Sequence, residues 1–294
     1  MDLTDYMIVP VAEQDDDLIE DKLDQYNNHI APPLPGVKEE GFTRKITDRD
    51  GKIIGGCCAM VHRWGFLFVD VLWVDERYRK MGLGSALLQD VERIGKAKGC
   101  FRASLTTTDY QGRYFYPKHG YRLCGETEDC PKGHSDFLFS KLLDDGAPYV
   151  PSHGPMDKAL EIVDGTEEDG EYICDKIGEY NAAIVPKAHE YQDVSRKVLG
   201  DDGKLIAAIF AGNGVRNAAI VDKIWVEEPY RTRGLGSKLL EEVEQDVKSK
   251  GATMMIVSVY DWNMDFFVRH GYYVIHTIED IPKGHNYYTV RKDL

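Results

Sequence analysis

The most regular hydrophobic pattern in the sequence is an apolar stretch that leads into a glycine-spaced turn and then into helical spacing. Residues 66–74 are apolar at every position but one, which predicts a buried strand. A turn with Gly82 and Gly84 follows this strand. Beyond the turn, apolar residues recur at the spacing of an amphipathic helix, at Leu87, Leu88, Val91 and Ile94.

The two glycines give this turn a possible binding role. Without side chains at Gly82 and Gly84, several backbone N–H groups can converge on one point. The first N–H groups of a helix have no partner within it, and the helix dipole is positive at this end. The turn therefore fits a phosphate or pyrophosphate group. Gly-x-Gly before a helix is a weak signal by itself, because plain turns contain it too.

The same strand, turn and helix occur a second time. The second strand is predicted over residues 218–226, and its turn again has the pattern Arg-x-x-Gly-x-Gly. Trp225 follows Trp73, and Arg231 follows Arg79, by the same 152 positions. A repeat of such long period indicates a duplicated domain and not a solenoid.

This repeat predicts two domains, which suits a length of 294 residues. We place the N-terminal domain at residues 1–143 and the C-terminal domain at residues 157–294. Residues 144–156 between them are rich in proline and glycine, which is typical of a linker. Each domain is predicted to open with a short strand and a helix, the helices covering residues 15–28 and 168–181.

A short helix is also predicted near the end of each copy. The first carries residues 114–116 and the second residues 266–267, and both end at a His-Gly-Tyr sequence. The glycine of this sequence is the usual left-handed helix stop. We expect His119 and His270 to provide a favourable charge at the negative end of their helices, not to act as catalytic bases.

Composition restricts the class of protein. The 43% hydrophobic and 29% charged residues are typical of a soluble globular protein. No apolar stretch approaches the length of a membrane span, and the acidic N-terminus does not resemble a signal or transit peptide. The six cysteines lack Cys-x-x-Cys spacing, so we expect reduced thiols, a cytoplasmic location and no metal site. A net charge of −14 argues against nucleic acid and is compatible with a cationic substrate, although an acidic surface that only confers solubility explains it more simply.

The pattern Arg-x-x-Gly-x-Gly between an apolar strand and a helix resembles the acyl-CoA-binding signature of the GNAT superfamily of N-acyltransferases. The resemblance covers nearly the whole chain and implies two tandem GNAT folds of the α+β class, each with a mixed sheet. It also implies acetyl-CoA as the acyl donor, with its pyrophosphate held by the loop amides. The residues assigned to coenzyme A on this ground are Leu72, Trp73, Val74, Arg79, Lys80, Met81, Gly82, Leu83, Gly84, Ser85 and Gln111 in the first copy, and Ile224, Trp225, Val226, Arg231, Thr232, Arg233, Gly234, Leu235, Gly236 and Ser237 in the second.

Acyl transfer from a thioester to an amine makes three chemical demands. The thioester carbonyl needs hydrogen-bond donors where charge develops. The amine must lose a proton, because a free alkyl amine has a pKa of roughly 10, and the thiolate is helped by a proton donor. The resemblance implies that the carbonyl is held by a backbone N–H freed at a bulge, at Leu72–Val74 and at Ile224–Val226.

The resemblance also implies a proton donor and a proton acceptor. Family members often place a tyrosine four residues before the glycine of a Gly-aromatic pair, which is Tyr116 here; the second copy has Phe267. Both rings could instead simply pack a core. Asp70 is the candidate for base or water relay, since it points to the same side of the strand as Leu72, and Asp222 is its partner in the second copy. The alternative for Asp70 is a polar residue satisfied by neighbouring backbone.

Together these features predict an N-acetyltransferase that transfers acetyl from acetyl-CoA to a primary amine by direct attack in a ternary complex. The N-terminal domain is expected to be catalytic, because it has the tyrosine. Two alternatives stay open: catalysis by the C-terminal domain, as in tandem enzymes resembling mycothiol synthase, and a non-catalytic acyl-CoA-binding or sensing protein. The acceptor is expected to be a small-molecule or peptide amine of unspecified identity, with no nucleic-acid or membrane partner. The two domains are expected to pair as a pseudo-dimer within one chain, which is a monomer or a homodimer.

Overall fold

The computed structural model describes residues 8–143, 156–214 and 216–294. The predicted linker lies outside this part of the chain, except for Met156. None of the helices in these ranges is long and apolar enough to span a bilayer.

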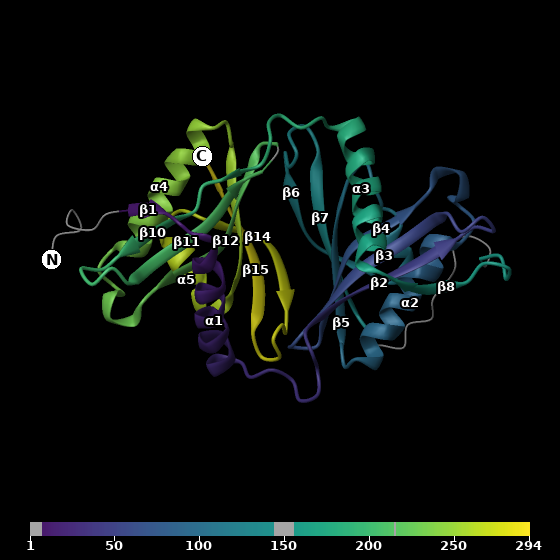
Figure 1. Cartoon of the computed structure of the whole chain (residues 1–294), viewed down its shortest axis with the longest axis horizontal. Coiled ribbons are helices and arrows are strands. Elements are labelled where there is room, and N and C mark those ends of the chain that lie inside the picture. The colour runs from purple at the N-terminus through teal and green to yellow at the C-terminus, as the bar shows by residue number, and fades with distance from the viewer. Residues whose placement is uncertain (1–7, 144–155, 215) are drawn as a thin grey trace. The chain divides into compact units, whose positions relative to one another are not determined.

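The chain forms two compact units, which are not the two sequence copies. The unit with the first glycine loop, here the first-loop unit, comprises Pro33–Glu128 and His134–Pro186. The unit with the second loop, the second-loop unit, comprises the chain up to Pro32, Asp129–Gly133 and Lys187–Leu294. Each unit therefore joins the loop of one copy to the opening strand and helix of the other, as the colours in Figure 1 show.

The first-loop unit is a mixed sheet with a helix on each face. Its elements in chain order are β2 (Glu40–Thr47), β3 (Ile53–His62), β4 (Phe66–Val74), the 3₁₀ helix η2 (Glu76–Tyr78), α2 (Leu83–Ala97), β5 (Arg102–Thr108), the 3₁₀ helix η3 (Tyr116–His119), β6 (Arg122–Glu128), β7 (Ser135–Leu142), β8 (Ile162–Gly165) and α3 (Glu167–Ile184). The strand order is β8-β2-β3-β4-β5-β7-β6. Only the β4–β5 pair in this order is parallel.

The second-loop unit repeats this architecture. Its elements are β1 (Ile8–Pro10), α1 (Glu13–Ile30), β9 (Gln192–Asp193), β10 (Arg196–Leu199), β11 (Leu205–Asn213), β12 (Ala218–Val226), the 3₁₀ helix η4 (Glu228–Tyr230), α4 (Leu235–Ser249), β13 (Met254–Tyr260), α5 (Asp261–Arg269), β14 (Tyr273–Glu279) and β15 (Asn286–Asp293). The main strand order is β1-β10-β11-β12-β13-β15-β14, with β12 and β13 parallel. The predicted α+β fold with a mixed sheet, present twice, is confirmed.

Two adjacent glycines on β3 show how helices cover the sheet of the first-loop unit. A Cβ atom at Gly55 would lie 3.3 Å from Leu87 of α2, and one at Gly56 would lie 2.1 Å from the Cδ1 atom of Ile173 on α3. Successive strand residues face opposite sides of a sheet, so α2 and α3 cover opposite faces. The missing side chain at Gly56 makes room for Ile173, which is completely buried.

Helix α3 comes from the second sequence copy but packs on strands of the first. Lys45 of β2 donates to the Asp169 carboxylate of α3 at 2.6 Å, and β8 pairs with β2. The second-loop unit has the reciprocal contact: Lys197 of β10 donates to Asp15 of α1 at 2.6 Å, and β1 pairs with β10. The two copies have therefore exchanged their opening strand and helix. The domain boundaries that were predicted from the repeat do not account for this exchange.

The segment after β5 differs from the prediction. No α-helix covers residues 114–116; the chain forms turns until the 3₁₀ helix η3 begins at Tyr116. Pro117 lacks the N–H that an α-helix begun before it would need for its i→i−4 hydrogen bond, whereas proline is tolerated in the first turn of the short η3. In the second-loop unit the equivalent segment is helical, as predicted, and forms α5.

Candidate functional site

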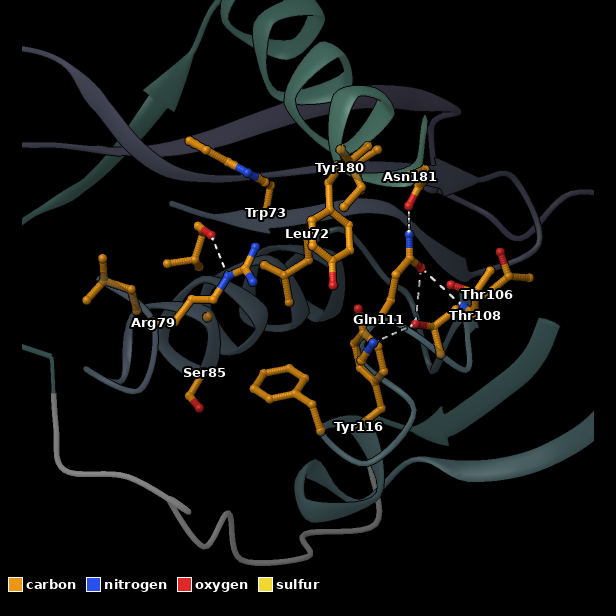
Figure 2. Close-up of a pocket in the computed structure, with 18 of the residues that line it drawn as sticks. Leu72, Trp73, Arg79, Ser85, Thr106, Thr108, Gln111, Tyr116, Tyr180 and Asn181 are labelled. Atoms are coloured by element: carbon orange, nitrogen blue, oxygen red, sulfur yellow. Dashed lines mark hydrogen bonds between the residues drawn. The ribbon is translucent and has the colours of Figure 1, made fainter. Parts of the chain in front are cut away.

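A pocket of about 490 Å³ lies where β4 and β5 separate. The parallel pairing of these strands joins Phe66–Phe68 to Arg102–Ser104 and ends there. Beyond this point the pocket is lined by β4, the glycine loop, β5, the turn before η3, β7 and α3 (Figure 2). All of these elements belong to the first-loop unit.

The bulge in β4 lies at Asp70 and not at Leu72–Val74, where it was predicted. The consecutive residues Cys58 and Ala59 of β3 pair with β4 residues that are two apart, which leaves Asp70 as the extra residue. β12 has the same bulge at Asp222. Leu72–Val74 keep their pairing with β3. The pairing of β4 with β5 covers only Phe66–Phe68, so the edge of Leu72–Val74 that faces away from β3 is not paired with β5 and borders the pocket.

The first glycine loop has the backbone geometry of an anion site. Lys80 and Gly82 have positive φ angles of 65° and 82°, a conformation that can turn neighbouring N–H groups to one side. The next N–H groups open α2 and have no partner within the helix. The side chain of Arg79 is held at the same place, because its Nε donates to the Val74 carbonyl at 3.1 Å.

The second glycine loop has the same geometry. The φ angle is 62° at Thr232 and 85° at Gly234, and Arg231 Nε donates to the Val226 carbonyl at 2.9 Å. The other coenzyme residues predicted for this copy lie at the end of β12, in the loop or at the start of α4: Ile224, Trp225, Arg233, Leu235, Gly236 and Ser237.

Nearly all residues predicted for the first copy lie together around the pocket. They are Asp70, Leu72, Trp73, Val74, Arg79, Lys80, Gly82, Leu83, Gly84, Ser85, Gln111 and Tyr116. Met81 is different: its side chain is 47% exposed and is not part of the lining.

His119 supports the loop and is not the charged helix-end residue that the sequence suggested. It is buried, and its ring nitrogens lie 2.9 Å from the Phe115 carbonyl oxygen and 2.9 Å from the Ser85 hydroxyl. Burial lowers the pKa of His119 below its usual value, so the imidazole is neutral at pH 7. The residue therefore ties η3 to the first turn of α2.

Tyr116 has its ring in the core and lines the pocket. Its side chain is 8% exposed and makes edge contacts with the rings of Phe115 and Tyr121. Burial raises the pKa of the Tyr116 phenol, which keeps it protonated and able to donate. Its counterpart Phe267 is also buried, packs against Tyr272 and has no hydroxyl group.

Asp70 borders the pocket with an exposed side chain. Partial desolvation by its neighbours raises the pKa of Asp70 above its usual value. The pKa of Asp222 in the second-loop unit is raised for the same reason. Because both copies have this carboxylate, it does not distinguish the two sites.

Asp136 is a pocket residue that the sequence analysis did not identify. It lies on β7 directly opposite Thr108 of β5, and burial raises its pKa to about 7. In the second-loop unit the same cross-strand pair is Tyr287 opposite Tyr260, with ring centroids 5.1 Å apart. The Pro-Lys-Gly-His sequence before this strand occurs in both copies and could have aligned the two positions.

Helix α3 closes one side of the pocket with residues of the second copy, Ile177, Tyr180 and Asn181. Two hydrogen bonds hold this part of α3 to the turn after β5, and Figure 2 shows the one between Gln111 and Asn181. Gln111 Nε2 donates to Asn181 Oδ1 at 2.6 Å, and the Tyr180 hydroxyl donates to the Tyr110 carbonyl at 2.9 Å. These residues were not predicted for this pocket, because the sequence repeat places α3 in the domain of its own copy. A complete pocket therefore needs residues from both copies.

The mixed sheet that parts beside a glycine loop and a helix N-terminus agrees with the acyltransferase fold expected from the sequence. The chain belongs to the acetyltransferase (GNAT) family, whose sequence model matches residues 10–121 and 166–272. It is therefore an acyltransferase by family.

Individual relatives cover one part of the chain each. The chain is 39% identical over 132 residues to blasticidin-S acetyltransferase of Streptomyces morookaense, which aligns 42% of this chain with 96% of that protein. It is 31% identical over 109 residues to glucosamine 6-phosphate N-acetyltransferase of Trypanosoma brucei brucei, over 31% of this chain and 74% of that one. A solved acetyltransferase structure from Bacillus cereus ATCC 14579 is 38% identical, with a TM-score of 0.43, and covers 46% of this chain and 96% of its own.

Proposed function

We propose that this protein is an N-acetyltransferase that moves an acetyl group from acetyl-CoA to a primary amine in the pocket of the first-loop unit. The observation that carries the proposal is that one pocket brings together a glycine loop, the buried phenol of Tyr116 and the carboxyl groups of Asp70 and Asp136. Thioester aminolysis needs these groups: an anion site for the donor, a proton donor and a proton acceptor.

The loop and strand geometry supports acetyl-CoA as the donor. The N–H groups from Lys80 to Ser85 and the Arg79 guanidinium would hold its pyrophosphate. The thioester carbonyl would accept from an N–H of Leu72–Val74 that faces the gap beside β5. The buried Tyr116 hydroxyl would donate to the departing sulfur, because its raised pKa keeps it protonated.

The second-loop unit is proposed to bind coenzyme A without transferring the acetyl group. Its loop repeats the positive φ angles and the arginine contact of the first. However, Phe267 stands in place of Tyr116, and Tyr287 in place of Asp136. The anion site is therefore duplicated, whereas the proton donor and the carboxyl group of Asp136 are not.

Charge favours an acceptor that is cationic and carries no phosphate. Asp70 and Asp136 both line the pocket, and the chain has a net charge of −14. An acceptor phosphate would be placed near like charges, which costs binding free energy. Of the acceptors that the two relatives are named for, we therefore expect glucosamine 6-phosphate to be the poorer one.

A panel of amines tests this proposal. Thiol release from acetyl-CoA is measured with blasticidin S, spermidine, a peptide with a free N-terminus and glucosamine 6-phosphate. We expect turnover of at least one unphosphorylated amine and the weakest turnover with glucosamine 6-phosphate. Tight coenzyme binding without turnover of any primary amine would instead support the acyl-CoA-sensing alternative.

A further inference from the structure

The two carboxyl groups of the pocket lie in different surroundings. Asp70 is the exposed extra residue of a bulge. Asp136 is partly buried in a regular part of the sheet, between its strand partners Thr108 on β5 and Thr127 on β6. Desolvation raises the pKa of Asp136 to about 7, against the opposing effect of a hydrogen bond from the Phe137 backbone N–H. A base of this strength is half ionised at neutral pH, where a general base works best.

The carboxyl group and the phenol are present together in one unit and missing together in the other. The first-loop unit has Asp136 and Tyr116, and the second-loop unit has Tyr287 and Phe267 at these positions. Asp70 does not follow this division, since the second-loop unit keeps Asp222 in the equivalent bulge. A carboxyl group that only stabilised the sheet would have no reason to change with the phenol, whereas two groups that move protons in one reaction would.

We infer that Asp136, and not Asp70, is the catalytic base of the first-loop unit, and that its carboxylate takes the proton of the acceptor ammonium group. This inference rests on the acetyl transfer proposed above. It assigns the acid and the base to different elements, η3 and β7, on the wall of one pocket.

The proton transfers balance over one turnover. Asp136 accepts one proton from the ammonium group, and the free amine attacks the thioester carbon and forms the C–N bond. When the C–S bond breaks, the sulfur takes the proton of the Tyr116 hydroxyl and leaves as a thiol. The nitrogen of the new amide gives its surplus proton to the tyrosinate, and Asp136 releases its proton to solvent. The products are the amide, free coenzyme A and one proton, with no other reactant.

Other ionisable groups lie near Asp136, and the experiment must distinguish their effect on the rate from that of Asp136. Those that line the same pocket are Asp70, Tyr78, Arg79, Lys80, Tyr116 and Tyr180. Glu126 and Glu128 flank its partner on β6, and His134 pairs with Asp109 at 2.9 Å just before β7. His134 is the other side chain beside the start of β7 that could accept a proton, so a variant of it serves as the control.

The test is the pH profile of kcat/KM with acetyl-CoA and the amine of the panel that turns over fastest. In the wild type, the rate should rise with pH through an inflection near 7, because Asp136 acts when ionised. In the Asp136→Asn variant this inflection should disappear. Its kcat at pH 7 should be lower than that of the wild type by roughly 10²- to 10⁴-fold. Part of the rate should return above pH 9, where more of the amine is free. Asp136→Glu should keep an inflection, and His134→Gln should leave the wild-type profile unchanged.

Thermal melting and coenzyme A titration of each variant show whether the fold and the donor site persist. An Asp136→Asn variant that folds, binds coenzyme A and keeps the inflection near pH 7 would overturn the inference. Loss of the inflection in His134→Gln would move the base to that histidine. If the wild type acetylates no amine of the panel, the proposed function fails first, and the inference with it.

Discussion

Replacing Tyr116 with phenylalanine is expected to lower kcat by roughly 10²- to 10⁴-fold, the usual contribution of a general acid. The change removes only a hydroxyl group. The ring stays between Phe115 and Tyr121, and Phe267 shows that a phenylalanine fits the equivalent core of the second-loop unit. Coenzyme A affinity should therefore be nearly unchanged, because the glycine loop is untouched.

The matched control is Tyr114→Phe, since this neighbouring side chain is 73% exposed. It should turn over at the wild-type rate. The reverse change in the other unit, Phe267→Tyr, should not create activity there, because Tyr287 and Tyr260 still fill the place of Asp136 and Thr108. Unaltered turnover of Tyr116→Phe would remove this residue as the acid.

The second large effect is expected from a substitution in the core-facing side of helix α3. Ile173→Asp should abolish acetyl transfer, although Ile173 belongs by sequence to the copy without the tyrosine. The side chain is completely buried against Gly56, and an unpaired carboxylate there should cost on the order of 3–5 kcal/mol. Detached from the sheet, α3 would also withdraw Tyr180 and Asn181 from the pocket.

The repeat offers a matched control for this variant. Ile19 on α1 is the counterpart of Ile173 and is equally buried, against Ala208 of the second-loop unit. Ile19→Asp should therefore leave turnover near the wild-type value and disturb coenzyme binding only at the second loop. Circular dichroism and calorimetric titration measure both effects. If Ile19→Asp is the inactive variant and Ile173→Asp the active one, the opening helices are not exchanged.

Much of each unit could be predicted from the sequence, because its signals are local. Strands β4 and β12 have the predicted bounds, residues 66–74 and 218–226. Each is followed by a turn in which Gly82 or Gly234 adopts a positive φ angle, which glycine allows at little cost. The helices after the turns show their apolar stripe at regular spacing. A repeat gives each of these local signals twice, so that each copy supports the other.

The exchange of the opening helices could not be predicted, because the two segments carry the same contact residues. Asp15 and Asp169 each accept from a lysine of the partner strand, and Ile19 and Ile173 each enter the core. Either helix therefore suits either sheet, and nothing in the local pattern says which one docks. Which helix packs on which sheet depends on the path of the chain between the elements. Hydrophobic periodicity carries no information about that path.

Asp136 was missed for a different reason. It lies in a strand whose apolar pattern predicts only a sheet element, and its high pKa comes from burial between two neighbouring strands. Burial of this kind depends on tertiary packing and has no motif. The one local signal is the difference between Asp136 and Tyr287 at aligned positions of the copies.

The most direct test of the division of labour between the two units uses one variant in each loop. Gly82 and Gly234 have φ angles of 82° and 85°, which valine cannot adopt without strain, so Gly82→Val and Gly234→Val should each disable one coenzyme site. Thiol release in the presence of the best acceptor is measured beside a calorimetric titration with coenzyme A. We predict two binding sites in the wild type and one in each variant, with turnover lowered roughly 100-fold or more in Gly82→Val and retained in Gly234→Val. Turnover lost only in Gly234→Val would contradict the account and assign acetyl transfer to the second-loop unit.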